Sequence, residues 1–277
     1  MMKFLHFILS HSIFIAFCAV ALSLQTVLLL SFPINGFLLG FIFFATLAGY
    51  NAYWVISRIS FSKQGKWLSL LHVNRSAAGV FVLAICGMIV CFLHVHLIMY
   101  NLVITFFFLG LYVIPLLPIK QLHFTRKVGF LKTTLLALAW TMVTILVPLQ
   151  VHVTDMSIPE ITLFCNRFLF MLTLCIIFDK RDAAMDKIRG LQSLATDLRP
   201  LVLHRLIMVI LVLYAATCLL LLFTGTSLAH VIALFVAGAF TCWVYLRSSE
   251  ERGYLFYYFV VDGLMFLSGS FSLLASI

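Results

Sequence analysis

Residues 161–195 read ITLFCNRFLFMLTLCIIFDKRDAAMDKIRGLQSLA, a long apolar run that ends in an acidic and basic segment. Asp179, Asp182 and Asp186 are the clustered acids of the chain. On a helix, offsets of three and seven residues fall on one face, where three carboxylates repel one another unless cations neutralise them. Hard cations such as Mg²⁺ prefer oxygen ligands, and phosphates complete their coordination shell. The spacing therefore predicts a face that binds Mg²⁺ and, through it, a diphosphate.

The rest of the chain is also predominantly apolar. Of its 277 residues, 64% are hydrophobic and only 10% are charged. A soluble domain cannot hide that much apolar surface, so lipid must solvate most of it. Runs of about 20 apolar residues mark transmembrane helices. They predict an all-α, polytopic membrane bundle of nine transmembrane helices, near 5–31, 34–57, 76–96, 98–118, 131–151, 158–178, 201–224, 226–246 and 254–276.

The basic residues predict how the bundle lies in the membrane. Of the 18 Lys and Arg residues, only Arg167 lies well inside a predicted span; the others are Lys3 and those within 58–75, 120–132, 180–205 and 247–252. These segments all fall on one side if the spans alternate, and the positive-inside rule makes that side cytoplasmic. We expect a multi-pass protein of a bacterial inner (plasma) membrane, with the N-terminus inside and the C-terminus outside. The net charge of +9 then faces anionic lipid head groups and does not indicate nucleic acid.

Residues 1–277 are predicted to form a single transmembrane domain. The connections on the inner side, 58–75, 119–132 and 179–200, are longer and more polar than those on the outer side. Elaborate loops usually carry the site, which predicts a central cavity open to the cytoplasmic side. The seven cysteines lie in predicted spans without a CxxC pair, so neither a disulfide framework nor a zinc site is indicated.

The acidic cluster also has a structural interpretation. Its carboxylates can simply pair with neighbouring Lys and Arg side chains on a solvated helix end, as charge runs usually do. Against this, Asp179 directly follows the apolar residues 172–178. That places it at the inner edge of the hydrocarbon, where ionised groups are costly and tend to be functional.

The acidic stretch resembles the second aspartate-rich motif of the UbiA superfamily of intramembrane prenyltransferases. That motif reads approximately D-x-x-D-x-x-x-D, followed by a glycine and a Thr/Ser-Leu tail. Its positions correspond here to Asp179, Asp182, Asp186, Gly190 and Ser193-Leu194. The resemblance extends over nearly the whole chain. The end of the family's fourth helix resembles Leu111-Tyr112 with Pro115 and Lys120, and the start of its fifth helix resembles Lys132 with Ala139-Trp140.

The chain departs from the family at the first motif, N-D-x-x-D. The corresponding residues are Asn51, Ala52, Tyr53, Trp54 and Val55, so the asparagine is present and both carboxylates are absent. Three interpretations follow. A single Mg²⁺ remains, basic side chains bind the phosphates directly, or catalysis is lost. For Asn51 itself, a backbone-bonded helix-end amide is the structural alternative to a substrate contact.

The resemblance implies transfer of a prenyl group from an allylic polyprenyl diphosphate to an aromatic or other lipophilic acceptor, assisted by Mg²⁺. Asp179, Asp182 and Asp186 are then the catalytic and metal-binding residues. The implied substrate-binding residues are Asn51, Arg58, Lys66, Tyr112, Lys120, Arg126, Lys127 and Lys132. Rings of Tyr53, Trp54, Tyr112 and Trp140 are candidates to stabilise a carbocation. The alternative is a non-catalytic protein of the same fold that binds or transports an isoprenoid or another anionic lipid; protein partners are not indicated.

Two charged residues inside predicted spans need partners. Arg167 lies near the middle of its span, so we expect it to face the bundle and to meet carbonyls or an acid. Asp262 lies roughly two turns into the last span. Pairing with a basic loop residue and lining the cavity are equally compatible with its position.

Overall fold

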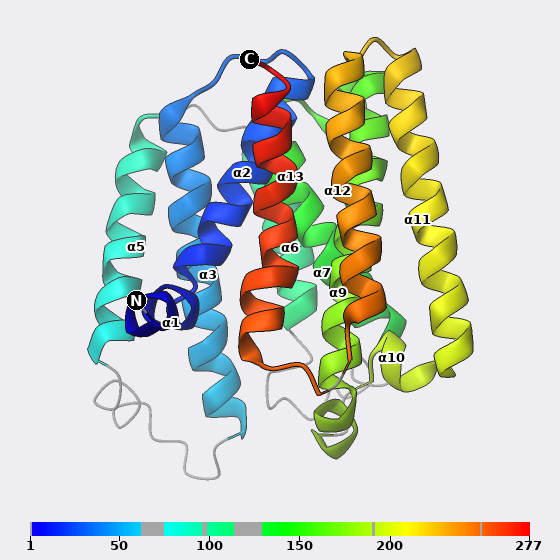
Figure 1. Cartoon of the computed structure of the whole chain (residues 1–277). Coiled ribbons are helices and arrows are strands. Elements are labelled where there is room, and N and C mark those ends of the chain that lie inside the picture. The colour runs from blue at the N-terminus through cyan, green and yellow to red at the C-terminus, as the bar shows by residue number, and fades with distance from the viewer. Residues whose placement is uncertain (1, 62–74, 96–98, 114–128, 190–191, 250) are drawn as a thin grey trace.

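The computed structural model describes residues 2–61, 75–95, 99–113, 129–189, 192–249 and 251–277. Its regular elements within these ranges are helical, as the apolar runs predict. Figure 1 shows long helices standing side by side in one bundle. The longer ones are α2 (Ile13–Leu29), α3 (Gly36–Phe61), α5 (Arg75–Leu93), α6 (Met99–Val113), α7 (Gly129–Thr141), α9 (Ile158–Arg189), α11 (Pro200–Phe223), α12 (Leu228–Arg247) and α13 (Asp262–Leu274).

Shorter elements complete and modify these helices. Helix α1 (Met2–Ser10) precedes α2, and α10 (Leu194–Asp197) follows α9. Two π-helical segments, η3 (Met142–Leu146) and η5 (Phe256–Val261), continue into α8 (Val147–Leu149) and α13. A 3₁₀ turn, η4 (Val153–Asp155), precedes α9.

By length and composition, six described helices can cross a membrane, or seven if α1 and α2 count as one broken span. The apolar segments Gly36–Ala52 and Met99–Tyr112 are shorter. The chain is thus a multi-pass membrane protein. Each predicted span contains a described helix, but nine crossings stay a prediction.

The first predicted span, 5–31, is not a continuous helix. Helices α1 and α2 meet at an angle of 69°, and Figure 1 shows α1 lying across the end of α2. Ser12, between them, has φ 62° in the left-handed region, which a helix cannot continue through. The His11 ring, held at the bend, bonds to Ser76 Oγ of α5 at 2.9 Å.

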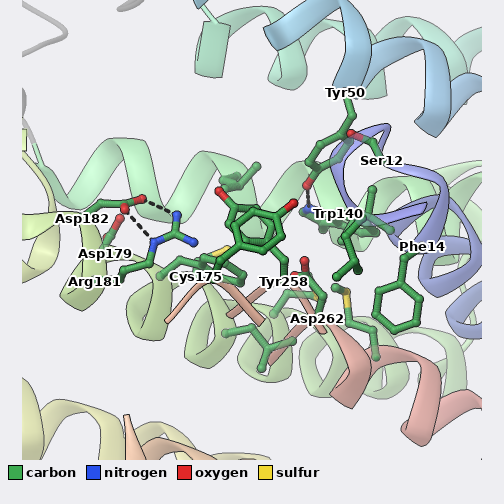
Figure 2. A pocket seen from close by; sticks show the side chains of 18 of the residues that line it. Ser12, Phe14, Tyr50, Trp140, Cys175, Asp179, Arg181, Asp182, Tyr258 and Asp262 are labelled. Atoms are coloured by element: carbon green, nitrogen blue, oxygen red, sulfur yellow. Dashed lines mark hydrogen bonds and ion pairs between the residues drawn. The ribbon is translucent and has the colours of Figure 1, made fainter. Parts of the chain in front are cut away.

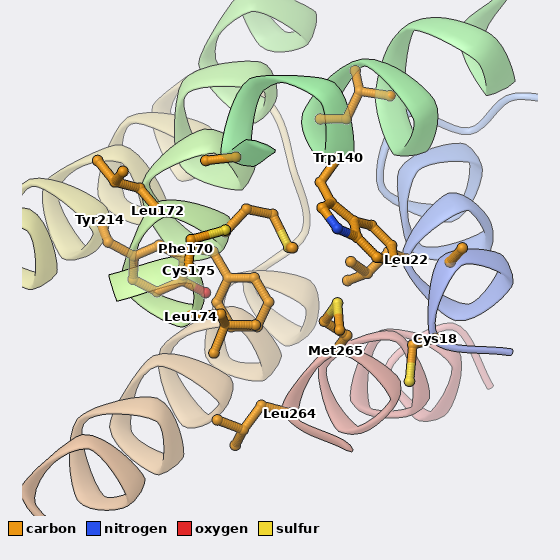
Figure 3. Close-up of a cluster of buried hydrophobic side chains, with 14 of the residues drawn as sticks. Cys18, Leu22, Trp140, Phe170, Leu172, Leu174, Cys175, Tyr214, Leu264 and Met265 are labelled. Carbon is orange, nitrogen blue, oxygen red and sulfur yellow. The ribbon is translucent and has the colours of Figure 1, made fainter. Parts of the chain in front are cut away.

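The core is built around α2, α9 and α13. Helix α9 packs against α7 and α11, while α2 packs against α13 and α3. Figure 3 shows the apolar side chains where these elements meet, among them Leu22, Trp140, Phe170 and Met265. Because lipid offers no hydrophobic drive between helices, close packing and buried hydrogen bonds must hold such a bundle.

Arg167 provides several of those hydrogen bonds. Its side chain is 2% exposed and donates to Leu22 O at 3.0 Å and to Gln25 Oε1 at 2.7 Å. The Gln25 amide in turn donates to Ser268 O at 3.0 Å and to Ser272 Oγ at 2.7 Å. Arg167 therefore faces the bundle and meets a carbonyl, as predicted, and this network joins α2, α9 and α13.

Candidate functional site

The acidic face lies on the last turns of α9. This helix has 32 residues, about 48 Å at the usual rise, so its end extends past a span of average length. Asp179, Asp182 and Asp186 all line one cavity of about 370 Å³. Asp179 and Asp186 are buried, at 7% and 4% exposure, whereas the Asp182 side chain is 42% exposed. The predicted common face is therefore present and borders an open space.

Helix α7 brings a cation and a hydroxyl to two of these acids. Lys132 Nζ lies 2.8 Å from Asp186 Oδ2 and 4.0 Å from Asp179 Oδ1. The neighbouring Thr133 hydroxyl donates to Asp179 Oδ2. One ammonium group therefore stands between two carboxylates and offsets their repulsion.

The start of α7 is fixed by α10. The Gly129 amide donates to Asp197 Oδ2 at 3.2 Å. A Cβ on Gly129 would meet the backbone of Ser193 at 2.5 Å, so only glycine allows this approach. The Ser193-Leu194 tail of the resembling motif thus helps to position Lys132. Gly190 lies outside the described residues.

The third acid has a different partner. Arg181 donates from Nε and Nη2 to the two oxygens of Asp182, at 2.7 and 2.8 Å. Its guanidinium stacks over the rings of Phe178, Tyr257 and Tyr258, with centroid distances of 4.9, 5.1 and 4.8 Å. Bidentate pairing and cation–π contacts both favour arginine over lysine here.

The cavity has a charged end and an aromatic end. Figure 2 shows Asp182 and Arg181 at one end, Tyr258 in the middle, and Trp140 with Phe14 at the other end. The Trp140 indole N–H donates to the Tyr50 hydroxyl at 3.2 Å. Further lining residues come from α1, α2, α6 and α9, including Leu9, Ile15, Tyr112, Met171 and Cys175.

A second, almost wholly apolar cavity of about 300 Å³ adjoins the first. It lies between α3, α6 and α7 and is lined by side chains such as Phe41, Leu102 and Val143. Tyr50, Tyr112, Leu136 and Trp140 line both spaces, so these residues form the boundary between a charged compartment and a hydrocarbon-like one.

The predicted substrate-binding residues divide into three groups. Tyr112 and Lys132 line the cavity. Asn51 does not line it; its amide donates to His11 O at 3.1 Å and to Leu47 O at 2.8 Å, which matches the structural alternative, and substrate contact stays a prediction. Lys66, Lys120, Arg126 and Lys127 lie outside the described residues, as do the side chains of Arg58, Tyr53 and Trp54.

Sequence reasoning missed several lining residues. In the sequence, Arg181 is one of several basic neighbours of the acids, and Tyr50 and Tyr258 are two of many aromatic residues. Asp262 had two open interpretations, and in the structure it lines the cavity. A signal was available for Asp262, because an acid within an apolar span is rarely without function.

The donor chemistry of the site fits Mg²⁺ in part. Carboxylate oxygens are suitable ligands, and Asp179 with Asp186 already shares one cation, the Lys132 ammonium. Within the described ranges, however, no three acidic, His or Cys side chains converge on one point. Two carboxylates therefore fit one ion whose remaining ligands come from phosphate or water, and Asp182, facing Arg181, stays a predicted ligand.

Comparison with known proteins adds a fold-level result. No family model matches the sequence, and no curated protein matches it. A solved structure from work on digeranylgeranylglyceryl phosphate synthase in membranes superimposes with a TM-score of 0.57 at 15% identity, covering 100% of this chain and 98% of that one. That protein is a UbiA-superfamily prenyltransferase. The chain therefore has the fold that the resemblance implies, over its whole length.

Proposed function

We propose that this chain binds an allylic polyprenyl diphosphate and transfers its prenyl group to an aromatic or other lipophilic acceptor. The observation that carries the proposal is the buried acidic face at one end of a cavity whose other end is aromatic. Its fold, shared along the whole chain with a membrane prenyltransferase, supports the same assignment.

The charge balance favours a bound divalent cation. Asp179, Asp182, Asp186 and Asp262 line the cavity, against Lys132 and Arg181 as its described basic residues. This excess of acid repels an anion unless a cation enters. We propose that Asp179 and Asp186 hold Mg²⁺ and that Asp182 assists. When bound, Mg²⁺ neutralises charge on the leaving diphosphate, which promotes ionisation of the allylic C–O bond.

The chain's own groups have separate tasks. Lys132 and Arg181 lie beside the acids and are placed to contact phosphate oxygens. We expect Arg58, Lys66, Lys120, Arg126 and Lys127 to add positive charge from the cytoplasmic side. The adjoining apolar cavity suits the prenyl chain, and the boundary rings of Tyr50, Tyr112 and Trp140 suit a carbocation shielded from water.

The second candidate is a non-catalytic isoprenoid-binding or transport protein of the same fold. Two observations favour it. No acid stands at the positions of the first motif, 51–55, and the three aspartates near the end of α9 are already paired with internal cations. Such a protein binds a diphosphate without cleaving it.

One experiment separates the two. Purified protein is incubated with Mg²⁺, labelled geranylgeranyl diphosphate and a panel of lipophilic acceptors, and both pyrophosphate release and prenylated product are measured. If the chain is an enzyme, both pyrophosphate release and prenylated product are expected. Binding of the diphosphate without release supports the non-catalytic candidate, and absence of binding contradicts both.

A further inference from the structure

Asp262 is a buried acid that the acidic face on α9 does not include. It is the first residue of α13, is 7% exposed and lines the charged-to-aromatic cavity. Figure 2 shows its carboxylate on the same side of the helix as the cavity. Its main-chain carbonyl accepts the Cys18 thiol at 3.3 Å, but the carboxylate itself makes no hydrogen bond or ion pair with the described residues.

The helix geometry aims this side chain at the cavity. Tyr258 and Met265, four residues before and three residues after Asp262, also line the space, which is the spacing of one helical face. Tyr258 belongs to the π-helical segment η5. Single wide turns of this kind often stand at functional sites.

The surroundings make a solitary carboxylate costly. Asp262 lines the same cavity as the rings of Tyr258, Trp140 and Phe14 (Figure 2). The charge of Arg181 acts on it electrostatically, but the Arg181 guanidinium is already bound by both oxygens of Asp182. A buried acid without a donor loses the hydrogen bonds that water gave it, and no protein hydrogen bond replaces them. A hydrogen-bond donor on a bound ligand would replace the hydrogen bonds that the carboxylate lost.

We infer that Asp262 binds the acceptor, by accepting a hydrogen bond from a hydroxyl group on an otherwise apolar molecule. The transfer step rests on the proposed function. In it, the hydroxyl oxygen forms a bond to C1 of the prenyl chain while the C1–O bond to diphosphate breaks. Diphosphate leaves with that electron pair, and the hydroxyl proton passes to the Asp262 carboxylate.

This assignment separates the two ligands in space. The diphosphate is expected at the acids of α9, and the acceptor hydroxyl at Asp262, toward the aromatic end. The acceptor class follows: a lipid alcohol with a free O–H, whereas the matching ether, which has no donor, is a poor ligand.

Binding of two matched lipids tests this directly. The probes are 1-O-hexadecylglycerol and its 2,3-dimethyl ether, each titrated into detergent-purified protein, with hexadecylamine as a third ligand. Wild-type protein is expected to prefer the alcohol by roughly ten- to a hundred-fold, the usual effect of a hydrogen bond to a charged group. Asp262→Leu is expected to abolish that preference. Asp155→Leu, at an exposed acid of η4, serves as the matched control and should retain it.

A second variant distinguishes loss of the carboxylate's role from misfolding of the protein. Asp262→Asn keeps the shape and one acceptor oxygen, so it should still bind the alcohol but form no prenylated product from it. Equal wild-type affinity for alcohol and ether overturns the inference, as does an unchanged preference in Asp262→Leu or preference for the amine alone. Binding of geranylgeranyl diphosphate to the same proteins is measured in parallel. If the diphosphate does not bind, the proposed function is contradicted. The preference for the alcohol over the ether tests the role of Asp262 separately.

Discussion

Lys132 offsets part of the negative charge of the acidic face. Its ammonium bridges Asp186 and Asp179, both of which are buried. Removing one partner of a buried ion pair leaves uncompensated charge, which is far more destabilising than losing a surface pair. Under the proposed function, Mg²⁺ takes over the same task. Lys132 and Mg²⁺ are therefore alternative neutralising groups for one pair of carboxylates.

Lys132→Gln should consequently make stability depend on Mg²⁺. We expect a lower unfolding temperature than wild type in EDTA and a larger increase on adding Mg²⁺, because a ligand that binds the folded state stabilises it. Thermal unfolding in detergent with and without millimolar Mg²⁺ measures both.

Lys187→Gln is the control, since Lys187 lies nearby on α9 and is exposed. It should respond to Mg²⁺ as wild type does. If Lys132→Gln gains no more from Mg²⁺ than this control, the shared-site interpretation is wrong.

At this scale the sequence predicted one wall of the cavity. Asp179, Asp182 and Asp186 were identified because helical spacing places them on one face and an apolar run precedes them. Arg181 and Tyr258 were not, because their roles depend on contacts between α9 and η5. In a chain with 15% aromatic residues, no local pattern tells a cavity ring from a lipid-facing one.

At the scale of elements, α2 and α13 approach each other closely at Gly269. A Cβ there would overlap the backbone carbonyl of Ala21. Small residues at such crossings let membrane helices pack by direct contact. The same two helices carry Gln25, Ser268 and Ser272 of the Arg167 network, so a wider crossing would also strain those hydrogen bonds.

Gly269→Ala is therefore expected to destabilise the protein by about 1–3 kcal/mol, the range for overpacking. Gly263→Ala is the matched control on the same helix, since its Cβ would meet Phe14 at an ordinary 3.7 Å. It should be neutral or slightly stabilising, because alanine favours helix over glycine. The denaturation midpoints of both variants and of the wild type, in the same detergent, measure these stability changes. Equal midpoints would contradict the close approach at Gly269.

The helices themselves were largely predictable, but their irregularities were not. Apolar length locates spans whatever the local geometry, so each predicted segment contains a described helix. The break at Ser12 lies in the polar triplet Ser10-His11-Ser12. The π-helical segments η3 and η5, by contrast, are as apolar as their neighbours. They depend on packing against other helices, which a single span does not encode.

For the whole molecule, several of the described basic residues gather at one end. The end of α9, the start of α11 and the end of α12 lie together in Figure 1, and these carry Lys187, Arg205 and Arg247. From the positive-inside rule we expect that end to face the cytoplasm, with the acidic face cytoplasmic and the C-terminus external.

Fusion reporters test this orientation. Expressed in a bacterial inner membrane, alkaline phosphatase fused after Ile277 should be active and green fluorescent protein fused there dark. Truncation after Ser248, with the same reporters, should give the reverse result. A fluorescent fusion after Ile277 would place the acidic face outside and contradict the proposed access of a cytoplasmic diphosphate.

The central claim is that buried carboxylates at the end of α9 bind a prenyl diphosphate through Mg²⁺. Equilibrium binding of labelled geranylgeranyl diphosphate to wild-type protein and Asp179→Asn, each in Mg²⁺ and in EDTA, tests it most directly. We predict binding by wild type in Mg²⁺ that weakens at least about ten-fold in EDTA or in the variant. Equal affinity under all four conditions would contradict it.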